Sequence, residues 1–417
     1  MENFCALKKE VIDRDLCTGC GTCIGMCPTK TLDFQNEEII DKEKKCISCG
    51  MCMKVCPGKN FSVQEWSQRI YGEEYNPDSV FGSYQDIFNV RSCDDNIRER
   101  TASGGAVTQL LIDMLESHKV QGVVVTRAKR EVPYEFEVCI ATDREQILEA
   151  AQSKYMIIPV NRIIPKIKEQ EDKIAFVGLP CQIQGMRKAM EQDSQLRKKI
   201  EVLISIFCGF NMEAAATDYL ISKSHICKDN IEILEYRRKQ GAETGFYVKG
   251  DNGQIFFVNK HGYTFLNLIF SPKRCWKCYD YSGEFADIAV GDAWDKGQGW
   301  SRVIVRTDKG MDLLKNSISK ETLVSEQADV SRILTTQNKV ISYKKKQIGV
   351  RKRFMKSFPE YGIAFPKQKM GVRVKGFLMY LILELFKTKA GKVLIQIIPF
   401  QLMVKFSSRL KGNEIKK

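Results

Sequence analysis

The chain has 417 residues, of which 16 are cysteine and 3 are histidine, and its formal net charge is +14 at pH 7. With so few histidines, haem ligation, histidine-rich metal sites and His-based triads are poor candidates, and the length predicts two or three domains. The charge is concentrated at one end, because residues 339–417 contain 20 Lys and Arg against 3 Asp and Glu. The rest of the chain is close to neutral, so the charge gives no reason to expect nucleic-acid binding.

A cysteine motif, C-x2-C-x2-C-x3-C-P, occurs twice within the first 57 residues. Its cysteines are Cys17, Cys20, Cys23 and Cys27 in the first copy and Cys46, Cys49, Cys52 and Cys56 in the second. This spacing is typical of bacterial ferredoxins with two 4Fe-4S clusters, in which the fourth cysteine of each copy ligates the other cluster. We therefore assign one cluster to Cys17, Cys20, Cys23 and Cys56, and the other to Cys46, Cys49, Cys52 and Cys27. Residues 1–62 are predicted to form this ferredoxin-like module, which is too short to have a large core of its own.

Zinc ligation and disulfide bonding are alternative roles for these cysteines, and both agree less well with the sequence. Zinc sites favour separate C-x2-C pairs rather than a run of four cysteines that ends in proline. A disulfide scaffold needs an oxidising compartment, and we find no export signal, so we expect a cytoplasmic protein with metal-ligating thiolates. Between the ligands, Gly19, Gly21, Ser48 and Gly50 are predicted to form tight turns whose N–H groups donate to cluster sulfur.

The next part of the chain is predicted to begin with a linker at residues 63–90 that lies on the following domain. A glycine turn, Thr101-Ala-Ser-Gly-Gly105, then opens an amphipathic helix that extends to His118. Strands are expected at 120–126, 137–142, 173–178, 201–207 and 302–306, and a hairpin at 246–258 that turns at Asp251-Asn-Gly253. This alternation of strands and helices predicts an α/β core with a mixed sheet, in which the hairpin supplies the antiparallel part.

Four cysteines of this core are candidate ligands for a third 4Fe-4S cluster. Cys181 and Cys208 each follow a predicted strand, and Cys275 and Cys278 form a C-x2-C pair. Strand ends of an α/β sheet gather at one edge, where the four thiols would meet. Inert buried cysteines and half of a zinc ribbon are the alternatives, and the spacing alone does not decide between them.

The turn at Ser103-Gly104-Gly105 is a candidate phosphate site, because it precedes the N-terminus of a helix. Helix capping alone also explains such a turn. Clusters pass single electrons, whereas most organic reductions need two, and a flavin is the usual converter between them. A flavin carries a phosphate or pyrophosphate group, which such a turn suits.

Together these segments resemble the coenzyme F420 hydrogenase/dehydrogenase beta-subunit family. The matching segments, in the family's order, are Arg100–Thr108, Ser153–Tyr155, Gly178–Gln182, Phe207–Gly209, Cys275–Cys278 and Ala286–Asp292. The resemblance covers about residues 90–310 and implies a core in two parts, 91–170 and 171–335. It implies an FAD flavoprotein with an iron–sulfur cluster beside the flavin, which favours the third cluster at Cys181, Cys208, Cys275 and Cys278.

The resemblance also implies which residues form the flavin site. These are Thr101, Ser103, Gly104, Gly105, Thr108, Lys154, Gly291 and Asp292, and the catalytic candidates are Lys154, Tyr155 and Asp292. Relatives transfer electrons between ferredoxin-type clusters and an organic acceptor, so we expect a ferredoxin or another redox protein as donor and an organic substrate. Relatives usually have polar residues where Met156-Ile-Ile158 stands here, so coenzyme F420 is not assumed to be the acceptor.

Residues 336–417 are predicted to form a basic helical tail. Its apolar stretches, 377–386 and 393–406, are shorter than the roughly 18 uncharged residues of a spanning helix. Basic amphipathic segments can bind an anionic membrane surface, which would place the protein at the inner face of the membrane. The favoured alternative is a helical appendage whose apolar faces pack on the core while its lysines stay solvated.

The leading hypothesis is an oxidoreductase in which electrons enter at the N-terminal clusters and pass through the core cluster and FAD to an organic substrate. The alternative is a non-catalytic electron-transfer subunit that docks to a separate redox enzyme. The remaining cysteines, Cys5, Cys93, Cys139 and Cys227, are expected to be structural.

Overall fold

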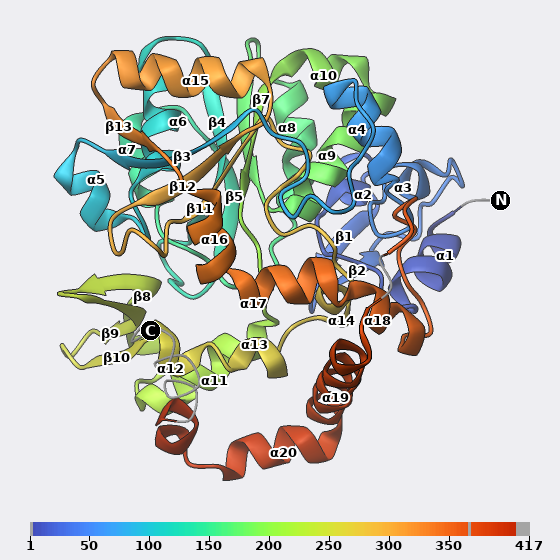
Figure 1. Cartoon of the computed structure of the whole chain (residues 1–417), viewed down its shortest axis with the longest axis vertical. Coiled ribbons are helices and arrows are strands. Elements are labelled where there is room, and N and C mark those ends of the chain that lie inside the picture. Colours follow the sequence, from blue (N-terminus) through green and yellow to red (C-terminus); the bar gives the residue numbers. More distant parts are fainter. Residues whose placement is uncertain (1–2, 366–367, 406–417) are drawn as a thin grey trace.

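The N-terminal module is a small unit at the side of the molecule (blue in Figure 1). The computed structural model of the chain describes residues 3–365 and 368–405. The elements of the module are α1 (Phe4–Leu7), the π-helical turn η1 (Lys8–Ile12), α2 (Thr22–Gly25), β1 (Leu32–Gln35), β2 (Glu38–Asp41) and α3 (Met51–Lys54). Strands β1 and β2 pair antiparallel. The small apolar core of the module includes Cys23, Cys52 and Cys56, so the cysteines make up part of the core that so short a segment can build.

An eight-stranded sheet forms the centre of the molecule. Its strands are β3 (Asp86–Ser92), β4 (Gly122–Ala128), β5 (Phe136–Ala141), β6 (Ile174–Gly178), β7 (Ile200–Ile206), β11 (Ile288–Asp292), β12 (Ser301–Val305) and β13 (Leu323–Gln327). Their order is β13-β3-β12-β11-β7-β6-β4-β5. Strands β4, β6, β7 and β11 run parallel, and the outer strands pair antiparallel. The predicted α/β core with a mixed sheet is therefore confirmed.

Helices cover both faces of this sheet (Figure 1). One layer contains α6 (Ala106–Glu116), α7 (Arg144–Glu149) and α15 (Asp308–Ser319), and the other contains α8 (Ile164–Lys168), α9 (Pro180–Gln192) and α10 (Ser194–Lys199). On β4, Val123 and Val125 pack toward the first layer and Val124 packs toward the second. Successive side chains of a strand point to opposite faces, so a strand buried on both faces has an apolar sequence.

The predicted hairpin belongs to a second, three-stranded sheet, so it is not what makes the main sheet mixed. This sheet has the order β10-β9-β8, with β8 (Ile231–Gln240), β9 (Glu243–Gly250) and β10 (Ile255–Asn259). The helices packed on it are α11 (Ala214–Ser224), α12 (Lys260–Tyr263) and α13 (Leu266–Ile269), and α14 (Lys273–Trp276) follows them in the chain. The turn between β9 and β10 contains Gly253 at φ +82°, as its Asp-Asn-Gly sequence predicts. The second sheet has its own apolar cluster around Leu220, Tyr236 and Phe246.

The segment predicted as a linker, residues 63–90, carries regular structure. Helix α4 (Val63–Tyr71) begins it, and β3 already starts at Asp86 and lies inside the main sheet. The short helix α5 (Asp95–Arg100) follows β3. The linker interpretation missed β3 because the sequence Asp-Ile-Phe-Asn-Val-Arg-Ser mixes polar and apolar residues without clear alternation.

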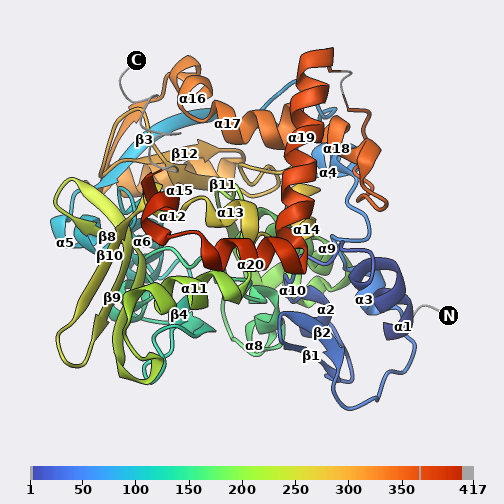
Figure 2. The same cartoon turned by 90° about the horizontal axis from the view of Figure 1, so that it is seen from below.

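The basic C-terminal segment consists of helices that cross the lower side of the core (Figure 2). They are α16 (Val330–Thr336), α17 (Asn338–Ile341), the π-helical turn η4 (Ser342–Lys346), α18 (Ile348–Phe354), α19 (Met370–Lys387) and α20 (Lys389–Ile397). The expectation that its lysines stay solvated is wrong for Lys344 and Lys345, which are 1% and 5% exposed, and Arg351 is buried as well. Among the helices that the structure describes, none has both the length and the apolar character needed to cross a bilayer.

Candidate metal centres and cofactor site

The two cysteine motifs of the module adopt matching backbone turns. Gly19 and Ser48 hold equivalent places in the two copies, with φ of +64° and +57°. Gly21 and Gly50 follow at +83° and +72°, and each immediately precedes a short helix. The predicted tight turns are present, and glycine serves them because left-handed backbone strains residues with a Cβ. The N–H of Gly19 points at the Sγ of Cys17, 3.5 Å away.

One cavity of the module supports the crossed assignment of ligands. It is lined by Cys17, Cys20 and Cys23 from the first motif and by Cys56 from the second. Burial, together with the neighbouring thiols of Cys56 and Cys20, raises the pKa of the Cys17 thiol to about 12. The hydroxyl of Thr22 lies 3.1 Å from the Sγ of Cys20. Four thiols around one cavity, three of them buried and that of Cys17 half-buried, are a donor set that fits a 4Fe-4S cluster.

The other set of module cysteines lies closer to solvent. Cys46 and Cys49 are exposed, Cys27 is half-buried and Cys52 is buried. Burial raises the pKa of Cys52 to about 11, and Cys46 is the next cause of that rise. The second set is thus the more accessible of the two.

The four core cysteines come together as the spacing and the resemblance predict. Residues Gly178 and Ser205 are paired at the ends of the parallel strands β6 and β7, and Cys181 and Cys208 each follow three residues later. Cys275 and Cys278 come from α14 and the turn after it. All four line one cavity of about 650 Å³. Among the described residues, no three His, Cys, Asp or Glu side chains converge closely enough to hold a single metal ion.

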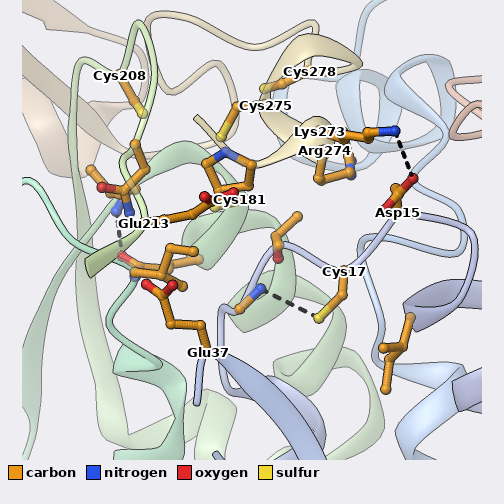
Figure 3. A pocket seen from close by; sticks show the side chains of 18 of the residues that line it. Asp15, Cys17, Glu37, Cys181, Cys208, Glu213, Lys273, Arg274, Cys275 and Cys278 are labelled. Carbon is orange, nitrogen blue, oxygen red and sulfur yellow. Dashed lines mark hydrogen bonds and ion pairs between the residues drawn. The ribbon is translucent and has the colours of Figure 1, made fainter. Parts of the chain in front are cut away.

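The same cavity contains Cys17 of the module (Figure 3). Cys208, Cys275 and Cys278 lie on one side, and Cys17 lies across the cavity from them (Figure 3). Burial raises the pKa of the Cys181 thiol, and the next cause is Cys20 of the module, ahead of Cys208. The core site and the buried site of the module are therefore immediate neighbours.

A buried lysine faces the core cysteines. Burial lowers the pKa of Lys344, but Cys278, Cys208 and Cys275 raise it by more, so that its pKa is raised overall. Its ammonium group also bonds to Cys278. A lysine that is 1% exposed needs a negative charge beside it. The thiolates of a ligated cluster supply that charge, so Lys344 fits an iron–sulfur group at this place.

Other buried cations connect the core to the module. The Nζ of Lys277 donates to the carbonyls of Arg14 and Asp15 at 3.0 and 3.1 Å. The Nζ of Lys188 donates to the carbonyl of Cys56 at 3.1 Å. Arg274, which is 4% exposed, borders the cysteine cavity. A cluster ligated by four thiolates is an anion, and these buried cations would offset the charge of a cluster bound beside them.

Asn161 holds the buried site of the module against the core. Its backbone N–H donates to the carbonyl of Cys20 at 2.9 Å. Its side-chain Nδ2 donates to Thr22 Oγ1 and to the carbonyl of Gln182, both at 2.8 Å. Gly185 allows this approach, because a Cβ there would lie 2.2 Å from Thr22 Oγ1. One buried residue therefore contacts both the module beside Cys20 and helix α9, which carries Cys181.

The predicted flavin turn lies against strands β3 and β12. Ser103 Oγ donates to the carbonyl of Trp300 at 2.8 Å, and Gly104 N–H donates to Ser301 Oγ at 3.0 Å. A Cβ at Gly104 would lie 2.7 Å from the Ser301 nitrogen, so close backbone packing explains this glycine. Gly105, at φ +77°, precedes α6. Of the other predicted residues, Thr101 and Thr108 are buried, and Gly291 packs on the ring of Phe207.

Arg237 on β8, which sequence reasoning missed, joins this turn to Asp292. Its Nη1 donates to Asp292 Oδ2 at 3.0 Å, and its Nη2 donates to the carbonyl of Ala102 at 2.9 Å. Burial raises the pKa of Asp292, but Arg237 and Lys260 lower it by more, so that its pKa is lowered overall. Asp292 is therefore a carboxylate, and it holds Arg237 in place.

Positive charge exceeds negative charge around the turn. Lys239 donates to the carbonyl of Ser103 at 3.0 Å, and Lys260 lies 3.8 Å from Asp292. Burial lowers the pKa of Lys239, and the neighbouring cations Arg237 and Arg98 lower it further. The buried Nε of Arg237 has no partner among the described residues. This surplus fits an anionic group such as a pyrophosphate. The sequence contains one sign of this positive charge, because the basic residues at 237 and 239 are two positions apart on a strand and therefore lie on one face.

Lys154 and Tyr155 lie close to this region, but Lys154 bonds to backbone. Its Nζ donates to the carbonyls of Ala150, Ala151 and Gln152 at 2.5, 2.7 and 3.0 Å. Burial lowers the pKa of Lys154 to about 7. The ring of Tyr155 packs on Tyr236 with centroids 5.4 Å apart. All three N–H groups of the Lys154 ammonium are used to close the end of α7.

Comparisons with known proteins agree with this architecture. Residues 9–70 match the 4Fe-4S dicluster domain. Residues 87–165 and 171–331 match the N-terminal and C-terminal regions of the coenzyme F420 hydrogenase/dehydrogenase beta subunit. The fold and the cysteine motifs thus define an iron–sulfur protein of an electron-transfer class.

Curated relatives identify the family. Coenzyme F420 hydrogenase subunit beta of Methanothermobacter thermautotrophicus is 30% identical over 247 residues, which cover 57% of this chain and 83% of that protein. The chain belongs to the coenzyme F420 hydrogenase/dehydrogenase beta-subunit family. Coenzyme F420-dependent sulfite reductase of Methanocaldococcus jannaschii is 27% identical over 341 residues, which cover 78% of this chain and half of that protein.

A solved structure shares the fold. A chain of the F420-reducing hydrogenase complex from Methanosarcina barkeri superposes with a TM-score of 0.53 at 23% identity. The match covers 68% of this chain and 98% of that chain.

Proposed function

We propose that the chain is an iron–sulfur flavoprotein oxidoreductase that takes electrons from a ferredoxin or another redox protein and delivers them to an organic substrate. When bound, three 4Fe-4S clusters supply one-electron carriers, and FAD supplies the conversion between one-electron and two-electron chemistry. The observation that carries the proposal is the cavity in which Cys181, Cys208, Cys275 and Cys278 meet Cys17 of the module.

The burial of the cysteines supports a direction from the surface inward. Cys46 and Cys49 are exposed, so a redox partner can approach their site. Cys20 and Cys23 are buried, and Cys17 lines both the module cavity and the core cavity. The three sites therefore follow one another from the exposed Cys46 and Cys49, through the buried site of the module, to the core cavity.

The surplus of positive charge at the glycine turn supports the FAD part of the proposal. Arg237 and Lys260 pair with one carboxylate, Asp292, and Lys239 bonds to the carbonyl of Ser103, beside the N-terminus of α6. Helix N-termini and buried cations both favour phosphate groups. In this arrangement Lys239 holds the cofactor phosphates, and Asp292 orients Arg237 toward them.

The first test is the iron, acid-labile sulfide and flavin content of the anaerobically purified chain. We expect about twelve irons and one FAD per chain, since each cluster contains four irons. About eight irons would contradict the core site, and twelve irons without flavin would contradict only the FAD part.

Point variants locate the core site. Cys208→Ser and Lys344→Met should each lower the iron content to about eight per chain, because one loses a ligand and the other a buried countercharge. Cys227→Ser is the matched control, because Cys227 is exposed and lies outside the cavity. A full iron content in both test variants would contradict the assignment.

A second pair of variants locates the flavin. Lys239→Met should lose most of the bound FAD and keep the iron content, whereas Lys249→Met on the neighbouring strand β9 should keep both. Equal FAD content in the two variants would remove Lys239 and the glycine turn from the cofactor site.

The names of the relatives favour a second candidate function. Several are subunits of coenzyme F420 hydrogenases, which makes an electron-transfer subunit without its own substrate the alternative. Turnover by the isolated chain with a chemical reductant separates the two functions. Because the relatives are named for coenzyme F420, this deazaflavin is the first acceptor to test. Substrate reduction by the chain alone supports the enzyme, and reduction only after a partner protein is added supports the subunit.

A further inference from the structure

Helix α19 presents an apolar face to solvent along its whole length. Seven large apolar side chains on it are between 37% and 68% exposed: Met370, Val374, Phe377, Leu378, Leu381, Ile382 and Leu385. Their spacing follows the helical period, so they form one continuous stripe. Val393 and Ile397 on α20 and the following Leu402 are 53%, 71% and 58% exposed. Figure 2 shows both helices in front of the core, on one side of the molecule.

The opposite faces of the two helices are anchored to the protein. Leu383 is 1% exposed, and Gly376 lies close to Val350 of α18. Ile395 of α20 is 2% exposed and belongs to the apolar cluster of the second sheet. Helix α19 therefore has apolar side chains on both its inner and its outer face, and the chain itself buries only the inner face.

The charges around the stripe are almost all positive. The described residues 368–405 contain 7 Lys and Arg against 1 Glu and no Asp. Lys369 and Arg373 at the start of α19 and Lys405 after α20 are exposed. The single acidic residue of α19, Glu384, points away from the stripe, because it lines the cysteine cavity and lies 3.2 Å from Lys273. The outer face therefore combines apolar side chains with cations.

We propose that the outer faces of α19 and α20 bind the surface of an anionic lipid bilayer. The helices lie in the plane of the interface, with the stripe among the lipid chains and the cations at the headgroups. A second copy of the chain is disfavoured as the occupant, because it would bring two strongly positive surfaces together. The inference rests on α19 and α20 alone and does not depend on the proposed function.

The test is co-sedimentation of the anaerobically purified full chain with lipid vesicles. We expect binding to vesicles of phosphatidylcholine with about 30% phosphatidylglycerol, and binding at least roughly tenfold weaker to phosphatidylcholine alone. The double variant Leu378→Asp/Leu381→Asp should bind the anionic vesicles at least about tenfold less than the wild type. Both positions are exposed, so the variant should keep its iron content and its unfolding midpoint.

Two controls make the result specific. Ile255→Asp introduces one such charge at an apolar position of β10 that is 55% exposed, and it should bind like the wild type. Arg373→Gln should weaken binding to anionic vesicles and reduce its dependence on salt. Equal binding by the wild type and the double variant would overturn the proposal. So would a stable dimer of the wild-type chain that the double variant abolishes, because the face then binds a second copy.

Discussion

The two halves of the basic C-terminal segment use their residues in opposite ways. In residues 338–361, Lys344, Lys345 and Arg351 are buried and bond to groups of the core. In residues 370–405, cations are exposed beside an apolar stripe. The first half therefore contributes buried side chains to the core, whereas the second half forms part of the solvent-exposed surface.

The difference shows that the net charge of a segment does not tell which of its cations are buried beside anions and which are exposed to solvent. Three consecutive lysines make the point: Lys344 faces cysteines, Lys345 pairs with Glu284, and Lys346 is exposed to solvent. Four variants test this comparison, from the largest expected effect to the smallest.

Lys345→Met should destabilise the protein by about 3–5 kcal/mol, because Glu284 is then left buried without its ammonium partner. Glu284 is 1% exposed and also accepts a bond from Tyr75 Oη at 2.5 Å. The measurement is the urea midpoint under anaerobic conditions. Lys346→Met is the control and should leave the midpoint unchanged. The double variant Lys345→Met/Glu284→Gln should recover part of the lost stability. Equal urea midpoints for Lys345→Met and Lys346→Met would contradict the conclusion that residues 338–361 contribute buried cations to the core.

Leu383→Ala should cost about 2–4 kcal/mol, because a fully buried leucine leaves a cavity where α19 rests on the core. The helix should remain attached through α20. Limited proteolysis between residues 361 and 405 measures the weakened attachment, and it should proceed faster than in the wild type. Cleavage at the wild-type rate would mean that the inner face of α19 contributes little to its attachment.

Tyr361→Phe should cost about 1–3 kcal/mol and speed the loss of iron to a chelator. Its hydroxyl accepts bonds from Arg274 Nη1 and from the N–H of Tyr279, both at 3.1 Å, and donates to the carbonyl of Lys277 at 2.9 Å. These bonds hold the loop that carries Cys275 and Cys278. Tyr84→Phe, at a position that is 40% exposed, is the control. Iron loss at the same rate in both variants would separate this tyrosine from the core site.

Leu381→Gln should change the free energy of unfolding by less than about 0.5 kcal/mol, because the side chain is 46% exposed and packs on little. The urea midpoint measures it, alongside Leu383→Ala two residues away. A loss as large as that of Leu383→Ala would show that both faces of α19 are packed on protein.

Local patterns account for most of what could be predicted from the sequence. The paired motifs, the glycine turn before α6 and the hairpin each lie within a short stretch, where spacing and turn chemistry determine the backbone. The core cysteines could also be grouped, because Cys181 and Cys208 each come directly after a predicted strand.

Contacts between distant segments could not be predicted in the same way. Lys344 and Arg237 are basic residues like their neighbours, and only the packing of other elements shows that each lies beside a candidate site. Strand β3 was missed because its buried Asn89 bonds to Glu326 of β13, so the polarity of that residue is satisfied across the sheet. A partner more than 200 residues away leaves no trace in a local pattern.

The bonds of Tyr361 have a consequence for the order in which the protein is made. The loop with Cys275 and Cys278 is synthesised well before residue 361, yet its carbonyl and N–H groups bond to that tyrosine. The backbone beside Tyr361 also accepts the N–H groups of Phe61 and Val63 at 3.0 and 2.8 Å, where the module joins the core. Chains fold largely from the N-terminus as they emerge from the ribosome. These bonds can therefore form only once residues 360 and 361 have been added, long after the segments that they hold have been synthesised.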